Sequence, residues 1–267
     1  KDVEIVEFPY PDDWYNNVDK LGPKENLPEL GEIDGGEVDL AGAIGGYTVI
    51  SVDGTSALGV AGITALRSVS LTSPRPLNFA SATQIADSGL TAQGQLLQFP
   101  VVTSLARVSL AATGGGQLLF PAAISYADGV QANYDITASG AGSKIDLSHL
   151  TSMAGSDPHY GNRLTITASG GGEVDLSGAI SGYSVITLSD SSSVLNVAGV
   201  SSLADSYVGV SNGGTANFAA LTQLTRVSLS ATTGGQMLFP IAAGYADGVQ
   251  ANYDITASGA GSKIDLS

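Results

Sequence analysis

The segment YADGVQANYDITASGAGSKIDLS, from Tyr126 to Ser148, occurs a second time, letter for letter, from Tyr245 to Ser267. The residues before each copy also match: RVSLAATGGGQLLFP begins at Arg107, and RVSLSATTGGQMLFP begins at Arg226. Self-similarity at a fixed spacing is the sequence signature of repeat architectures. A catalytic site needs different residues at different places, so this duplication favours a surface that is used more than once.

A shorter unit recurs within the long repeat and contains two blocks that alternate apolar and polar residues. Such alternation is the two-residue period of a strand with one buried face. Successive units are about 20 residues apart, with longer steps where loop is inserted. The first block reads EVDLAG at Glu37, ALGVAG at Ala57, PLNFAS at Pro76, LLQFP at Leu96, QLLFP at Gln117, KIDLS at Lys144 and Lys263, EVDLSG at Glu173, VLNVAG at Val194, TANFAA at Thr215 and QMLFP at Gln236. The second block includes VISV at Val49, SVSL at Ser68, RVSL at Arg107 and Arg226, DITA at Asp135 and Asp254, TITA at Thr165 and VITL at Val185.

Glycine-rich corners such as TGGG at Thr113 and SGGG at Ser169 separate the blocks. Short strands joined by glycine corners in units of about 20 residues predict an all-β parallel solenoid, in which stacked rungs share one core. A sandwich or barrel of antiparallel strands is the alternative, although it does not require this periodicity. Two inner rows are expected. The first contains Val38, Leu77, Ile145, Val174 and Ile264, and the second contains Leu40, Phe79, Phe99, Phe120, Leu147, Leu176, Phe218 and Phe239.

Composition narrows the classes of function. The net charge of −15 and a charged fraction of 13% describe an acidic chain with few charges, which argues against nucleic acid and anionic membranes as partners. The absence of cysteine excludes disulfides and thiolate chemistry. No apolar run is long enough for a membrane helix, so membrane insertion is not expected. An acidic surface rich in Ser and Thr suits an extracellular setting.

Residues 1–34 differ from the repeat, because they hold four of the ten prolines, the sole tryptophan and many of the acids. We therefore divide the chain into an N-terminal segment, 1–34, and a repeat domain, 35–267. The N-terminal segment is interpreted as a cap over the first rung, with a linker or a donor strand for another subunit as alternatives. The exact second copy ends with the chain, so we expect the sequence to be part of a longer polypeptide.

Four acids share the outward position of the first block: Asp39, Asp146, Asp175 and Asp265. Stacked carboxylates can serve polysaccharide hydrolysis or bind calcium. Because Asn, Gln or Leu fills the same position in other rungs, we interpret this row as solvated rather than functional. The loop SDPHYGN, from Ser156 to Asn162, is interpreted as a polar turn. Calcium is the only cofactor considered, and no catalytic or metal-binding residue is assigned.

Hydroxyl and aromatic residues give two further hypotheses. An outward row of Ser51, Ser70, Thr91, Ser109, Thr137, Thr167, Thr187, Ser228 and Thr256 is expected on the second strand, and ordinary cross-strand stacking explains it better than ice binding. Aromatic rings can stack on sugars, and four tyrosines recur with the long repeat. These candidate ligand-binding residues are Tyr126, Tyr134, Tyr245 and Tyr253.

The blocks KIDLS, EVDLSG and RVSL, between glycine-rich corners, resemble the repeats of bacterial extracellular parallel β-helix proteins, including adhesin and autotransporter-like surface exoproteins. The resemblance covers about 33–267. It implies a right-handed parallel β-helix of about ten rungs, exported to the cell surface or the medium.

The resulting hypothesis is a non-catalytic structural or adhesive module: a stiff spacer, a stalk or a head-to-tail fibre subunit. The alternative is a module that binds or processes carbohydrate. Expected partners are other copies of itself, neighbouring domains of a longer chain, or cell-surface or matrix polysaccharide.

Overall fold

The computed structural model describes residues 4–7, 37–52, 57–129, 132–156, 162–247 and 253–266, and contains no helix in these ranges. Most of the N-terminal segment and residues 157–161 of the SDPHYGN loop lie outside the described residues. The strands are β1 Glu4–Glu7, β2 Glu37–Ile44, β3 Thr48–Ser51, β4 Ala57–Arg67, β5 Val69–Ser73, β6 Leu77–Asn78, β7 Gln84–Gln93, β8 Leu96–Gln98, β9 Ser104–Thr113, β10 Gln117–Leu119, β11 Ser125–Ala127, β12 Tyr134–Ser139, β13 Lys144–Leu147, β14 Ser152–Ala154, β15 Leu164–Ser169, β16 Glu173–Ser181, β17 Ser184–Leu188, β18 Val194–Ser211, β19 Thr215–Asn217, β20 Gln223–Thr232, β21 Gln236–Leu238, β22 Gly244–Ala246, β23 Ile255–Ser258 and β24 Lys263–Asp265.

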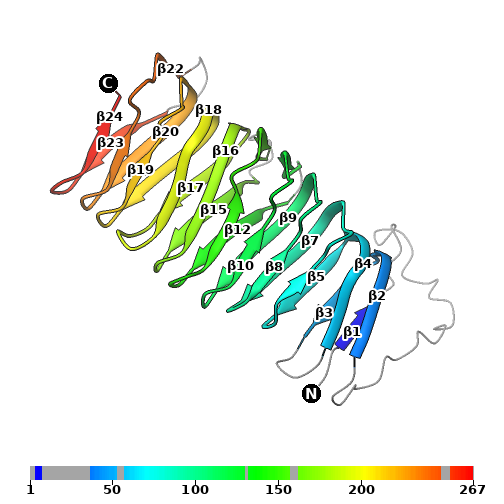
Figure 1. The fold of residues 1–267 in the computed structure, drawn as a ribbon. Helices are drawn as coiled ribbons and strands as arrows, with labels where there is room; N and C mark the ends of the chain where they lie inside the picture. Colours follow the sequence, from blue (N-terminus) through cyan, green and yellow to red (C-terminus); the bar gives the residue numbers. More distant parts are fainter. Residues whose placement is uncertain are drawn as a thin grey trace, which may run out of the picture.

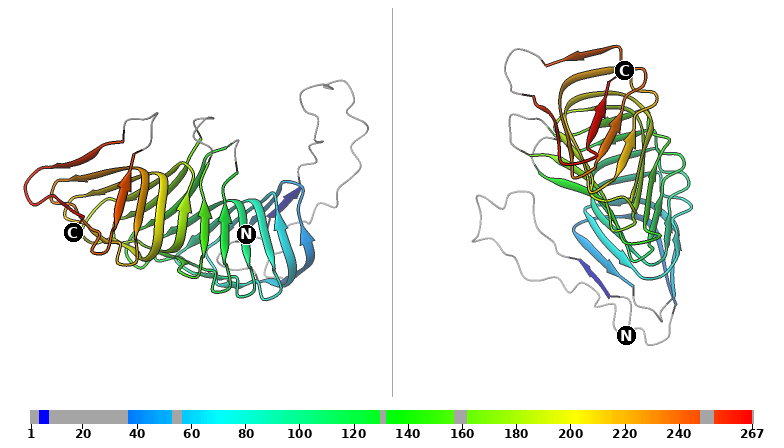
Figure 2. Two further views of the ribbon diagram at one scale, coloured as in Figure 1. Left: turned by 90° about the horizontal axis from the view of Figure 1, so that it is seen from above. Right: turned by 90° about the vertical axis from the view of Figure 1, so that its left-hand side faces the viewer.

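The strands pair mostly in parallel, as the repeated order of the blocks predicts. In β12, Ile136 pairs with Leu110 of β9 on one side and with Ile166 of β15 on the other. Figure 1 shows that the strand-forming segments follow one another in chain order from one end of the molecule to the other, so each strand pairs with strands about 20 to 30 residues away. The exception among the described strands is β1, which pairs antiparallel with β3 beside the first strands of the stack (Figure 2).

One continuous hydrophobic core runs through this stack and contains most members of the two predicted inner rows. Leu40 and Ile264 are partly buried and pack against the core, whereas Val38 is only partly buried and does not belong to it. Phe79, Phe99 and Phe120 are buried and stack face to face, with ring centroids 4.6 and 5.0 Å apart. Leu147 and Leu176 continue the row and are also buried. Each rung therefore covers the apolar side chains of its neighbour, which a single rung could not do alone.

The predicted outward hydroxyl row is wrong in its register. Ser51 lies in one row with Thr72 and Thr91, whereas Ser70 lies in the neighbouring row, opposite Gly89. The expected row therefore mixes two real rows that face the same side of the sheet. A slip of two residues preserves the alternation, so the pattern alone could not detect it.

Serine hydroxyls connect successive glycine corners. The backbone N–H groups of Gly115 and Gly234 donate to Ser143 Oγ and Ser262 Oγ of the following rung, at 3.0 and 2.9 Å. Both glycines have positive φ, 87° and 82°, a conformation that side chains disfavour. The corners therefore require glycine for their backbone conformation and use serine to bind one rung to the next.

The two exact copies of the long repeat have different environments. Ile136 in β12 is 0% exposed and has a strand on each side, whereas its counterpart Ile255 in β23 is 42% exposed and, among the described strands, pairs only with β20. Leu147 is 0% exposed, and its counterpart Leu266 is 39% exposed. Burial therefore depends on the neighbouring rung rather than on the local sequence.

Candidate functional site

The four candidate tyrosines do not form one surface. Tyr126 is 2% exposed, and its hydroxyl donates to the carbonyl of Val108 at 2.8 Å. Burial raises the pKa of Tyr126 well above its usual range. Its counterpart Tyr245 is partly buried and donates in the same way to the carbonyl of Val227 at 2.9 Å. Both side chains therefore brace the core, and the Tyr126 ring is not presented to a ligand.

Tyr134 and Tyr253 are only half-buried and lie near two arginines. Tyr134 packs against the core, and burial is the main cause that raises its pKa. The hydrogen bond with Asp87 is the main cause that raises the pKa of Arg107, and the charge interaction with Tyr134 adds to it. Tyr253 stands in the same relation to Arg226. Tyr134 and Tyr253 therefore lie beside the two arginines, and they do not form a continuous aromatic surface on which a sugar could stack.

Each of these arginines forms a forked ion pair with an aspartate on the preceding rung. Arg107 donates through Nε and Nη2 to the two carboxylate oxygens of Asp87, with Nη2 at 2.9 Å from Oδ2. Arg226 donates in the same way to Asp205, at 2.5 and 2.6 Å. The hydrogen bond from Arg107, opposed by burial and aided by charge attraction, holds the pKa of Asp87 below its usual value. We call these pairs the first fork and the second fork.

The forks lie at a recurring corner where the backbone is left-handed. Positive φ values between 53° and 62° occur at Tyr47, Ser68, Asp87 and Arg107. The two residues of the second fork, Asp205 and Arg226, also have positive φ. Such conformations are uncommon for residues other than glycine. The corner therefore turns each of these side chains outward in a row along the stack.

The forks were not expected from the sequence, although the sequence contains a signal for them. The tripeptide ADS occurs at 86–88 and at 204–206, about one rung before each RVSL block. In the structure Ala86 pairs with Ala106, and Ser88 pairs with Val108, so Asp87 and Arg107 meet between two paired positions. The sequence alone shows the two motifs but not the register that brings them together.

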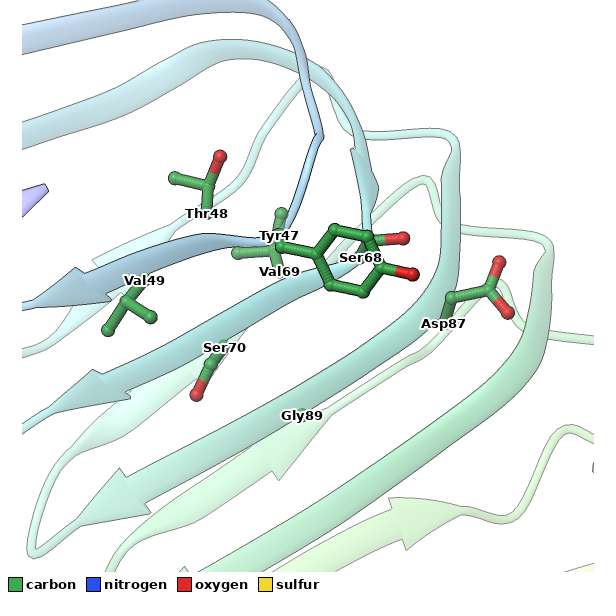
Figure 3. A pocket seen from close by; sticks show the side chains of 8 residues that line it. All are labelled: Tyr47, Thr48, Val49, Ser68, Val69, Ser70, Asp87 and Gly89. Carbon is green, nitrogen blue, oxygen red and sulfur yellow. The ribbon is translucent and has the colours of Figure 1, made fainter. Parts of the chain in front are cut away.

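A shallow hollow of about 370 Å³ adjoins the first fork. It is lined by Tyr47, Thr48, Val49, Ser68, Val69, Ser70, Asp87 and Gly89. In Figure 3 the Tyr47 ring extends across Ser68 toward Asp87, and Gly89 lies on the strand beneath the open space. A Cβ atom at Gly89 would meet nothing within 4 Å, so the missing side chain leaves the hollow open.

The predicted solvated carboxylate row is wrong at Asp175, whereas Asp39 is exposed and Asp146 and Asp265 are partly exposed. Asp146 pairs with Asp175 on the adjacent rung, but Asp175 is only 5% exposed. Lys144 Nζ lies 2.7 Å from Asp175 Oδ2 and 2.7 Å from Glu173 Oε1. The ammonium group therefore pairs with both carboxylates, and a partly buried ion pair replaces the solvated row that the pattern predicted at this position.

A second acid, Asp128, is buried after β11. It is 0% exposed, and neither of its carboxylate oxygens has a hydrogen-bond partner among the residues that the structure describes. Burial raises the pKa of Asp128 to about 6. Its counterpart Asp247 is exposed. The same residue in the same sequence is thus in two electrostatic environments.

Within the described ranges, no group of three or more His, Asp or Glu residues could hold a metal ion. The same ranges contain no helix that is long and apolar enough to cross a membrane. Comparisons with models of protein families, with curated proteins and with solved structures found no match to this chain.

Proposed function

We propose that the repeat domain is a right-handed parallel β-helix that serves as a non-catalytic extracellular structural or adhesive module. The observation that carries this proposal is the continuous core, which extends from Ile50 to Phe239 beneath parallel ladders. A rod with one shared core resists bending between rungs, because bending would open hydrogen bonds and apolar contacts together. About ten rungs at about 4.8 Å each give a rod of roughly 45 to 50 Å.

The extracellular setting and the role of the N-terminal segment are part of the proposal. The acidic, cysteine-free chain with many Ser and Thr residues supports export, as does its repeat composition. For 1–34 we propose a cap, which the antiparallel pairing of β1 with β3 supports. A strand at this position covers part of a sheet edge that would otherwise be open to association.

Small-angle X-ray scattering tests the rod. We expect a cross-section that is constant along the particle, and a compact sphere would contradict the proposal. Single-molecule pulling along the axis gives a second readout. Rungs of about 20 residues should release stepwise, each adding roughly 65 to 70 Å of extended chain. Release of the whole chain in one step would argue against nearest-neighbour stacking.

A module that processes polysaccharide is the second candidate, because Asp146 and Asp175 lie on adjacent rungs beside Lys144. Two neighbouring carboxyl groups are the usual equipment for glycoside hydrolysis. The test is to incubate the protein with a panel of polysaccharides and to measure new reducing ends. Activity that disappears in Asp146→Asn and Asp175→Asn would favour this candidate, and its absence over the whole panel would favour the non-catalytic module.

For self-association we propose that a second copy docks on the face formed by β23 and β24, wherever no further rung of a longer chain covers that face. Ile255 and Leu266 are substantially exposed there, although their counterparts elsewhere are buried. Sedimentation velocity over a range of concentrations tests this contact. Larger species should appear as concentration rises and should diminish in Ile255→Lys, while the matched change at the exposed Val194 should have little effect.

A further inference from the structure

The hollow beside the first fork combines an aromatic ring with several polar groups. Tyr47 is 57% exposed, so much of its surface faces solvent at the edge of the hollow. The hydroxyl groups of Ser68 and Ser70 contribute donors and acceptors on its floor. In Figure 3 Tyr47, Ser68 and Asp87 lie close together at the corner, and Ser70 lies on the adjoining strand β5.

Among the described residues, the first fork leaves hydrogen-bonding capacity unused. A guanidinium group has five N–H donors, and Arg107 directs two of them to Asp87. A carboxylate has about four acceptor positions, of which the fork occupies two. The side chains remain 42% and 32% exposed, respectively. The fork can therefore offer both donors and acceptors to a bound molecule while it holds them in a fixed orientation.

The charge of this site selects among ligand classes. Asp87 and Arg107 neutralise each other, so the fork has no net charge of its own. The protein as a whole carries −15, which disfavours anionic ligands. A molecule with adjacent hydroxyl groups matches mixed donors and acceptors, and its apolar C–H face can pack on an aromatic ring. A hollow of about 370 Å³ is at the small end of the range for ligand sites.

From these observations we infer that the hollow formed by Tyr47, Ser68, Ser70, Asp87 and Gly89 is a binding site for a neutral saccharide unit. The unit would pack against Tyr47 and exchange hydrogen bonds with the serines and with Asp87, the member of the first fork that lines the hollow. This inference rests on the proposed adhesive role and gives that role a ligand class. It places the site on the first fork and not on Tyr126, whose ring is buried.

Gly89 allows a direct test. Its φ is not in the left-handed region, and a Cβ atom there meets nothing within 4 Å, so Gly89→Leu should fold and fill the hollow. Gly244 has the same two properties and lies in β22, away from the hollow-lining residues, so Gly244→Leu is the matched control. Tyr47→Ala removes the exposed ring, and Asp205→Asn disrupts only the second fork.

The assay is native electrophoresis through gels that contain dextran, galactomannan or xylan as neutral polysaccharides, with polygalacturonate as an anionic comparison. We expect at least one neutral polysaccharide to retard the full chain. Gly89→Leu and Tyr47→Ala should each weaken that binding at least tenfold, whereas Gly244→Leu and Asp205→Asn should bind as the unchanged chain does. Circular dichroism of each variant verifies that it is folded.

Three results would overturn the inference: no retardation by any neutral polysaccharide, retardation by polygalacturonate alone, or undiminished binding by folded Gly89→Leu. If Gly89→Leu does not fold, Tyr47→Ala still tests the site, because Tyr47 is exposed and its truncation should not disturb folding. Scattering measures the rod independently of the hollow. A rod that binds no neutral polysaccharide would refute the saccharide site and leave the structural role intact.

Discussion

Ile136 and Ile255 provide an internally controlled test of how neighbouring rungs stabilise the fold. Both lie in the identical 23-residue segment, but Ile136 is 0% exposed and Ile255 is 42% exposed. Truncating a fully buried isoleucine to alanine costs about 3 to 4 kcal/mol, because contacts are lost and a cavity remains. At Ile255 only part of the side chain is packed and solvent can fill the space, so the cost should be about 1 to 1.5 kcal/mol.

The measurement is urea unfolding of Ile136→Ala and Ile255→Ala, followed by far-ultraviolet circular dichroism. The free energy of unfolding should fall by about 2 kcal/mol more for Ile136→Ala. The milder changes Ile136→Val and Ile255→Val should keep the same order with smaller losses. Equal losses at the two sites would refute the reasoning, because local sequence rather than the next rung would then determine burial.

Three further predictions concern corners, charge and rings. Gly116→Ala should lower the free energy of unfolding by about 3 kcal/mol or more, because the added Cβ would lie 2.1 Å from a backbone oxygen of an earlier strand. Gly114→Ala has open space around its Cβ but a positive φ, so it should cost only about 1 kcal/mol, and equal decreases in melting temperature for the two variants would contradict this prediction. Because the pKa of Asp128 is raised to about 6, the folded state binds the proton more tightly than the unfolded state, and the free energy of unfolding should fall by about 1 to 3 kcal/mol as the pH rises from 4 to 7. Urea unfolding measured at several pH values should show that this loss disappears in Asp128→Asn and persists in Asp247→Asn. Phe99→Ala should lower the free energy of unfolding by about 4 to 5 kcal/mol because it removes two stacking contacts, whereas Phe99→Leu should lower it by less than about 2 kcal/mol. Similar urea midpoints for the two variants would argue against the stacked row.

The inner rows could be predicted because two independent patterns agree on them. Alternation with a period of two identifies which face of a strand is apolar, and the 20-residue spacing identifies which strands are equivalent. Phe79, Phe99 and Phe120 satisfy both patterns, and the structure stacks their rings. A strand that carries bulky apolar residues also has a well-defined register, because a shift of one residue would expose its whole apolar row to solvent.

The candidate site could not be predicted to the same extent. A slip of two residues leaves every side chain on its original face, so the outward rows were assigned to the wrong partners at Ser70 and Ser109. The pairing of Asp87 with Arg107 depends on that register. Tyr126 occurs between two glycine-containing stretches and resembles a loop residue in the sequence, but stacking of β11 between β9 and β14 buries it.

The sequence by itself determined the strand content, the unit length, the apolar rows and the acidic, cysteine-free character of the surface. These properties follow from the residue types and their spacing along one chain. The tertiary structure alone decided which outward side chains meet, because neighbours across a ladder are about 20 residues apart and their register is set by corners and bulges. For the same reason, only the tertiary structure could make Ile136 a core residue and leave the identical Ile255 partly in water.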